Sequence, residues 1–115
     1  MINKDLTKDQ QFVLMAFYKE YKDKKNAGLP DAKCFGSPED FHDVVQFYYT
    51  VDYLIELCLS LHEDDGSGYL AGYRCECSII ELEITEKLIF FGENYLKNKG
   101  AKILKSLKDI KDILI

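Results

Sequence analysis

Two cysteines lie at a spacing that could bind a metal ion. Cys75 and Cys77 can face the same side of a β-strand, with Cys34, His42 or His62 as further ligands. Zinc ribbons and fingers use paired Cys-x-x-Cys motifs, which this sequence lacks. Free cysteines also serve as small buried apolar residues. We therefore predict no metal and no cofactor.

Both histidines lie near carboxylates, an arrangement that can transfer protons. His42 lies between Asp40 and Asp43, and His62 precedes Glu63. Catalysis would also need a nucleophile and an oxyanion site, and the sequence suggests neither. The Gly-Ser-Gly run at 66–68 follows a predicted helix and enters a predicted strand, the wrong order for a phosphate-binding loop. We therefore expect surface histidines, no catalytic residues and no enzymatic activity.

The composition is that of a folded protein with one core. The 115 residues are 47% hydrophobic and include 8 tyrosines and 7 phenylalanines. No apolar run approaches the roughly 20 residues that span a bilayer, and the start lacks the apolar segment of a signal peptide. We expect a cytoplasmic protein with no membrane partner and reduced cysteines.

Capping signals and apolar spacing predict the first two helices. Thr7 and Gln10 form a capping-box pattern that starts a helix ending near Lys25. Ser37 and Pro38 start a short helix to about Gln46, after a connection or brief strand at 31–35. The residues predicted to be buried are Val13, Leu14, Phe17, Tyr18 and Tyr21, then Phe41, Val44 and Val45.

Residues 50–85 predict a helix, a Gly-rich turn and a β-hairpin. Thr50 caps the helix, which runs to His62. The strands are expected at 69–74 and 79–84, with Gly72 at a bulge. The predicted buried residues are Val51, Leu54, Ile55, Cys58 and Leu61 in the helix, and Ile80, Leu82 and Ile84 in the second strand. Helices are then expected at 85–99 and 101–115.

This order of elements resembles the winged-helix superfamily, an α+β fold with a three-helix core and a hairpin wing. We expect a winged-helix domain at 1–100 and an additional C-terminal amphipathic helix at 101–115. The runs Thr-Glu-Lys at 85–87, Gly-Glu-Asn-Tyr-Leu-Lys at 92–97 and Ser-Leu-Lys-Asp-Ile-Lys at 106–111 are similar to the end of the YjcQ-like proteins. The resemblance implies a phage or prophage context and no enzymatic activity.

The charge distribution favours a protein partner. The net charge is −5, but residues 50–96 carry ten acidic residues against only Arg74 and Lys87. The helix at 50–62 contains no lysine or arginine. We predict a non-enzymatic module that binds an unidentified protein partner through the outer face of this helix and the hairpin. The predicted partner-binding residues are Asp52, Tyr53, Glu56, Leu59 and Glu63; a solvated acidic face with Tyr53 lying over the core is the other interpretation.

A DNA-binding transcriptional regulator is the alternative function. Winged helices usually contact DNA with the third helix and the wing, and phosphate contacts need cations. Arg74, the only arginine, either contacts DNA or pairs with a nearby carboxylate. The candidate DNA-binding residues are Tyr73, Arg74, Lys22, Lys24 and Lys25.

The C-terminal helix is a candidate dimerisation element. Its apolar stripe consists of Ile103, Leu107, Ile110 and Leu114. The stripe can pack on the first helix or pair with a second copy in a homodimer. We predict the homodimer, because the helix has no evident place in a three-helix core.

Overall fold

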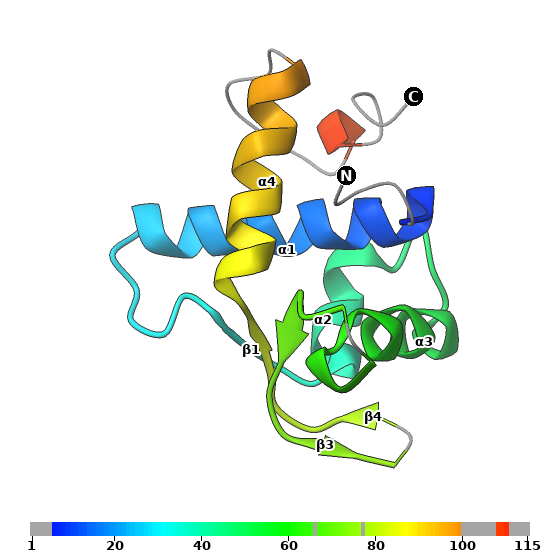
Figure 1. The fold of residues 1–115 in the computed structure, drawn as a ribbon. Helices are drawn as coiled ribbons and strands as arrows, with labels where there is room; N and C mark the ends of the chain where they lie inside the picture. The colour runs from blue at the N-terminus through cyan, green and yellow to red at the C-terminus, as the bar shows by residue number, and fades with distance from the viewer. Residues whose placement is uncertain (1–5, 66, 77, 100–107, 111–115) are drawn as a thin grey trace.

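The structure, a computed structural model, has a mixed α+β fold and describes residues 6–65, 67–76, 78–99 and 108–110 (Figure 1). Its helices and small antiparallel sheets confirm the predicted α+β class and the first four predicted helices. The elements are α1 (Lys8–Asn26), β1 (Cys34–Gly36), α2 (Pro38–Val45), α3 (Val51–Leu61), η1 (Glu63–Asp65), β2 (Leu70–Ala71), β3 (Arg74–Cys75), β4 (Ser78–Ile79), β5 (Leu82–Ile84) and α4 (Glu86–Lys99).

Helix α1 is the centre of the molecule. The predicted capping box forms: the Gln10 N–H donates to Thr7 Oγ1 at 3.1 Å, and the Thr7 N–H donates to Gln10 Oε1 at 2.9 Å. Residues 12–18 are all buried, which is more than one stripe. The reason is that α1 packs against both α3 and α4, and α4 crosses it in Figure 1. The predicted stripe is confirmed but describes only part of the buried surface.

Helices α2 and α3 begin where their caps predict. Ser37 caps α2 through a capping box with Asp40, and Thr50 Oγ1 accepts the Tyr53 N–H at 3.2 Å. Three residues of α3 differ from the prediction: Val51 and Ile55 are only half-buried, and Leu57 is buried although it was not predicted to be. Helix α3 packs against α2, α1 and β4, so its buried surface is turned towards the hairpin as well.

The β-hairpin at residues 70–84 consists of two short ladders separated by a bulge. Leu70 lies opposite Ile84, whereas Arg74 lies opposite Ile79, so the second strand contains one extra residue. The N–H groups of Ile80 and Glu81 both donate to the carbonyl oxygen of Tyr73, at 2.8 and 3.3 Å, which places the bulge there.

Because of this bulge, the prediction that Ile80 is buried is wrong. Ile79 is buried, while Ile80, predicted to face the core, is 50% exposed. The extra residue shifts the alternation by one position, and a one-residue shift moves a side chain to the other face. Gly72, which directly precedes Tyr73 at the bulge, has a φ of +115°. A Cβ added to it would lie 1.8 Å from the Glu81 carbonyl oxygen. The hairpin therefore requires glycine at this position.

Strand β1 completes the larger sheet, whose order is β1-β5-β2. The strand forms at the brief connection predicted before α2 and pairs antiparallel with β5. The hairpin strands β3 and β4 form a separate two-stranded ladder, which lies at the lower edge of the molecule in Figure 1 and contacts α3 through β4. The larger sheet therefore holds the base of the hairpin, and α3 contacts its outer part.

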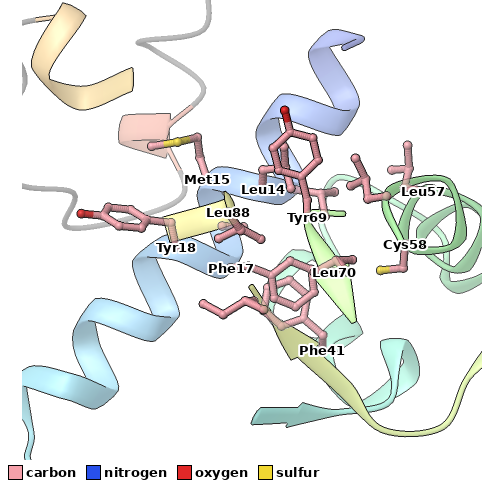
Figure 2. Close-up of a cluster of buried hydrophobic side chains, with 14 of the residues drawn as sticks. Leu14, Met15, Phe17, Tyr18, Phe41, Leu57, Cys58, Tyr69, Leu70 and Leu88 are labelled. Atoms are coloured by element: carbon pink, nitrogen blue, oxygen red, sulfur yellow. The ribbon is translucent and has the colours of Figure 1, made fainter. Parts of the chain in front are cut away.

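The core joins α1 to every other helix, as Figure 2 shows for its central side chains. Phe17 stacks on Phe41 with ring centroids 3.8 Å apart, and Tyr69 meets the Phe91 ring edge-on at 5.8 Å. Gly92 lies where α4 crosses α1, because an added Cβ would come within 2.4 Å of the Tyr18 ring. A glycine that costs helix propensity therefore permits close packing here.

Ile110, one residue of the predicted dimerisation stripe, is not exposed as a contact with a second copy would require. Residues 108–110 are helical, and Ile110 is fully buried in the core of its own chain. At this position the alternative, packing within the chain, holds, and the homodimer stays a prediction. Ile103, Leu107 and Leu114 lie outside the described residues.

Candidate functional site

The outer face of α3 carries two of the three predicted acidic residues, Asp52 and Glu56, on successive turns. Asp52, Glu56 and Glu63 are exposed, and none forms an ion pair with another residue of the described ranges. Positions 52, 56 and 59 follow helical spacing and share one side of α3, whereas Glu63 follows the extended residue His62 and lies in η1. Leu59 is half-buried and packs against the core, so it offers a partner only part of its side chain.

Tyr53 is held in place by α1. It is 40% exposed, and its hydroxyl donates to Asp9 Oδ2 at 2.6 Å. The Tyr49 hydroxyl donates to Asp9 Oδ1 at 3.1 Å. The hydrogen bond to Asp9 raises the pKa of Tyr53, while burial, followed by the charge of Asp9, raises the pKa of Tyr49. Tyr53 is thus neither free nor tucked over the core, and 40% of its surface remains exposed.

His62 connects α3 to the hairpin, a role that sequence reasoning missed. The side chain is 1% exposed, so the expectation of a surface histidine is wrong. Its Nδ1 accepts the Asp64 N–H at 3.1 Å, which leaves Nε2 to donate to the Gly72 carbonyl oxygen at 3.1 Å. With both ring nitrogens engaged by the backbone, His62 acts as a structural residue.

The other residues with catalytic or metal-binding side chains are dispersed. His42 Nε2 bonds to the Tyr49 carbonyl oxygen at 3.0 Å, and burial raises the pKa of the Cys58 thiol to about 12. Cys34 and Cys75 are exposed, and Cys77 lies outside the described residues. Within the described ranges, no three His, Cys, Asp or Glu side chains are grouped in a way that could hold a metal ion.

The candidate DNA-binding residues come from two separate elements. Tyr73 is 67% exposed and Arg74 half-buried in the hairpin, whereas the three lysines lie in the second half of α1. The Lys24 ammonium donates to the Cys34 carbonyl oxygen at 2.6 Å and lies 4.1 Å from the centre of the Phe35 ring. Lys25 lies 5.7 Å from the Tyr21 ring, and Lys22 is half-buried. Two of the three lysines thus have contacts within the protein.

The hairpin carries two features that the sequence did not reveal. Tyr73 and Ile80 are both exposed, and their backbones meet at the bulge. A cleft of about 410 Å³ lies between the bulge and β1, and it is lined by Cys34, Gly36, Gly72, Glu81, Leu82 and Glu83. The bulge that exposes Ile80 also forms part of this cleft.

Comparison of the chain with models of protein families, with curated protein sequences and with solved structures finds no match. The resemblance of the C-terminal runs to YjcQ-like proteins therefore stays a prediction. Among the described residues, no helix is long and apolar enough to cross a membrane.

Proposed function

We propose that this chain is a winged-helix protein that binds a protein partner through its acidic helix–hairpin face and has no enzymatic activity. The fold proposal is supported by topology. A strand between α1 and α2 pairs with the second strand of a hairpin that follows α3, in the sheet order β1-β5-β2. In a winged helix, α3 is the recognition helix and the hairpin is the wing.

The observation that carries the functional proposal is the charge of the α3 outer face. Asp52 and Glu56 are exposed there, Glu63 is exposed just beyond the helix in η1, and α3 contains no lysine or arginine. Carboxylates repel phosphates, whereas protein–DNA affinity depends on cations that neutralise them. The same carboxylates would attract a basic protein surface and would raise its association rate. The contact between α3 and β4 makes the helix and hairpin one continuous surface.

DNA binding is the second candidate function. It is supported by Tyr73 and Arg74, an aromatic and a cationic residue side by side in the hairpin. In this alternative the hairpin would contact the phosphate backbone while α3 stays outside the major groove. Arg74→Glu would then reduce DNA affinity and its salt dependence.

Charge reversal on α3 tests the two functions against each other. The probes are a fluorescent lysine-rich peptide and a fluorescent DNA duplex, titrated at low salt. We expect Asp52→Lys with Glu56→Lys to weaken peptide binding about tenfold, because two attractive contacts become repulsive. A matched control, Glu20→Lys with Glu93→Lys on α1 and α4, changes the net charge equally and should leave peptide binding nearly unchanged.

Two results would contradict the proposal. Equal weakening by the control pair would show that only net charge matters. Salt-sensitive binding of the DNA duplex that Arg74→Glu abolishes would support the regulator instead.

A further inference from the structure

At its bulge, the hairpin exposes more apolar surface than its fold requires. Tyr73 is 67% exposed and Ile80 is 50% exposed, and we call these two residues the hairpin patch. The Tyr73 carbonyl oxygen accepts the Ile80 N–H at 2.8 Å, so the two residues meet across the bulge. Exposed aromatic and aliphatic groups that lie together are typical of binding anchors.

The backbone geometry positions this patch. Gly72, in a conformation that other residues rarely adopt, lets the Glu81 carbonyl approach, and the extra residue in the second strand turns Ile80 outwards. Bulges commonly re-aim side chains at functional surfaces. An ordinary hairpin alternation would bury Ile80 beside Leu82 and Ile84, and no patch would form.

The cleft beside the patch has acidic walls. Gly72 and Glu81, the sequence neighbours of Tyr73 and Ile80, line it together with Glu83. Both glutamates are exposed, and the Glu81 carboxylate has no hydrogen bond or ion pair with the rest of the described chain. The cleft of about 410 Å³ is large enough for a lysine or arginine side chain to enter.

We infer that the hairpin patch and its cleft bind a basic segment of a protein in which an apolar side chain adjoins a lysine or arginine. The apolar side chain covers Tyr73 and Ile80, and the cation enters the cleft towards Glu81. Charge complementarity selects this occupant, because Glu76, Glu81 and Glu83 outnumber the single cation Arg74 in the hairpin. This inference rests on the proposed function for the sign of the partner's charge, but it places the energetic anchor in the hairpin.

The end of the described chain lies too far away to be the occupant. Figure 1 places residues 108–110 beyond α1, and the tip of the hairpin lies at the opposite end of the molecule. Ile110 is moreover buried in the core. An external partner is therefore the occupant that this surface fits.

Selection of peptides from a random library on the immobilised full chain tests the inference. We expect the enriched peptides to combine an aromatic or aliphatic residue with adjacent lysine or arginine. Tyr73→Ser with Ile80→Ser should lower their affinity at least about tenfold, and Glu81→Gln should lower it for basic peptides only. The control is Leu29→Ser with Phe90→Ser, which removes comparable exposed apolar residues from other elements and should leave affinity unchanged.

The opposing outcomes separate this inference from the proposed function. Enriched basic peptides that lack apolar residues and bind the hairpin variant equally would overturn the patch and leave the acidic α3 face as the site. Enrichment of no basic peptides would overturn both. A dimer by light scattering that becomes a monomer in the hairpin variant would identify a second copy as the occupant, and DNA binding lost in that variant would identify a nucleic acid; either result overturns the inference.

Discussion

Helix α1 buries a continuous run of apolar side chains, whereas the hairpin leaves two of its apolar side chains exposed. Every residue from 12 to 18 in α1 is buried, although the helix is one element in a small protein. In the hairpin, Ile79 is buried, but its neighbour Ile80 and the facing residue Tyr73 are exposed. Both regions contain apolar residues, but they differ in the number of packing neighbours: α1 contacts α2, α3 and α4, whereas the hairpin lies at the edge of the molecule (Figure 1).

Under the proposed function, this difference separates residues that stabilise the fold from residues that bind a partner. A side chain enclosed on all sides contributes to the free energy of folding through burial and close packing. An exposed side chain on a rigid element contributes little to folding and remains available to a partner. If buried apolar residues stabilise the fold and exposed ones do not, substitutions in α1 should unfold the protein. Substitutions of the exposed hairpin residues Tyr73 and Ile80 should leave it folded.

The largest effect is expected at Phe17. Its ring is fully buried, stacks on Phe41 and meets Phe35 edge-on at 5.2 Å. Phe17→Ala should lower the free energy of unfolding by about 3–5 kcal/mol, because it leaves a cavity and removes both ring contacts. Urea denaturation followed by circular dichroism measures the change. A loss below about 1 kcal/mol would contradict the central role of α1.

Ile110 extends the comparison to the C-terminal segment. Since its side chain is fully buried, Ile110→Ala should cost about 2–4 kcal/mol of folding free energy. The same variant should leave the molar mass by light scattering unchanged, because Ile110 packs within its own chain. A lower mass with unaltered unfolding would instead restore this residue to a dimer interface.

Local sequence signals were sufficient for the helices and insufficient for the hairpin. The caps at Thr7, Ser37 and Thr50 act on backbone groups three residues away, so sequence alone fixed those helix starts. The unbroken apolar run at 12–18 is a signal of a helix that is buried all round, so a single helical stripe describes only part of the buried surface.

The candidate site was less predictable because it depends on contacts between distant residues. The acidic face of α3 follows from helical spacing, but the Asp9 contact with Tyr53 spans 44 positions. The burial of His62 depends on the Gly72 carbonyl, and the exposure of Ile80 depends on a one-residue shift between strands. The place of Ile110 in the core likewise needed tertiary structure, and amphipathic spacing alone did not distinguish self-packing from a dimer.

A smaller effect is expected where α1 meets α3, and it depends on pH. The pKa of Tyr49 is raised in the folded state, so above about pH 10 the unfolded chain releases this proton first and stability falls as pH rises. Asp9→Asn removes a charge that raises this pKa but keeps the burial, so the alkaline loss of stability should become smaller. Near neutral pH the same variant should cost about 1 kcal/mol, because the hydrogen bonds that Tyr49 and Tyr53 donate to Asp9 are weakened.

Urea denaturation at neutral and alkaline pH measures both parts of this prediction. Tyr49→Phe is the control, because it has no phenol to ionise and should also reduce the alkaline loss. An Asp9→Asn variant with the wild-type dependence on alkaline pH would show that the Asp9 contact has no influence on Tyr49.

The smallest effect on folding is expected at the exposed hairpin residue Tyr73, and this variant is the most direct test of the comparison. Tyr73→Ser removes a side chain that is 67% exposed, so the free energy of unfolding should change by less than about 0.5 kcal/mol. Ile79→Ser, only a few residues away and buried between the hairpin and the helices, should cost several times more in the same assay. A large loss from Tyr73→Ser would mean that Tyr73 stabilises the fold, and its exposure could then no longer be explained by binding. A small loss from both variants would mean that the whole hairpin is dispensable for stability. The part of the chain that stabilises the fold would then end at the base of the hairpin, where His62 contacts Gly72.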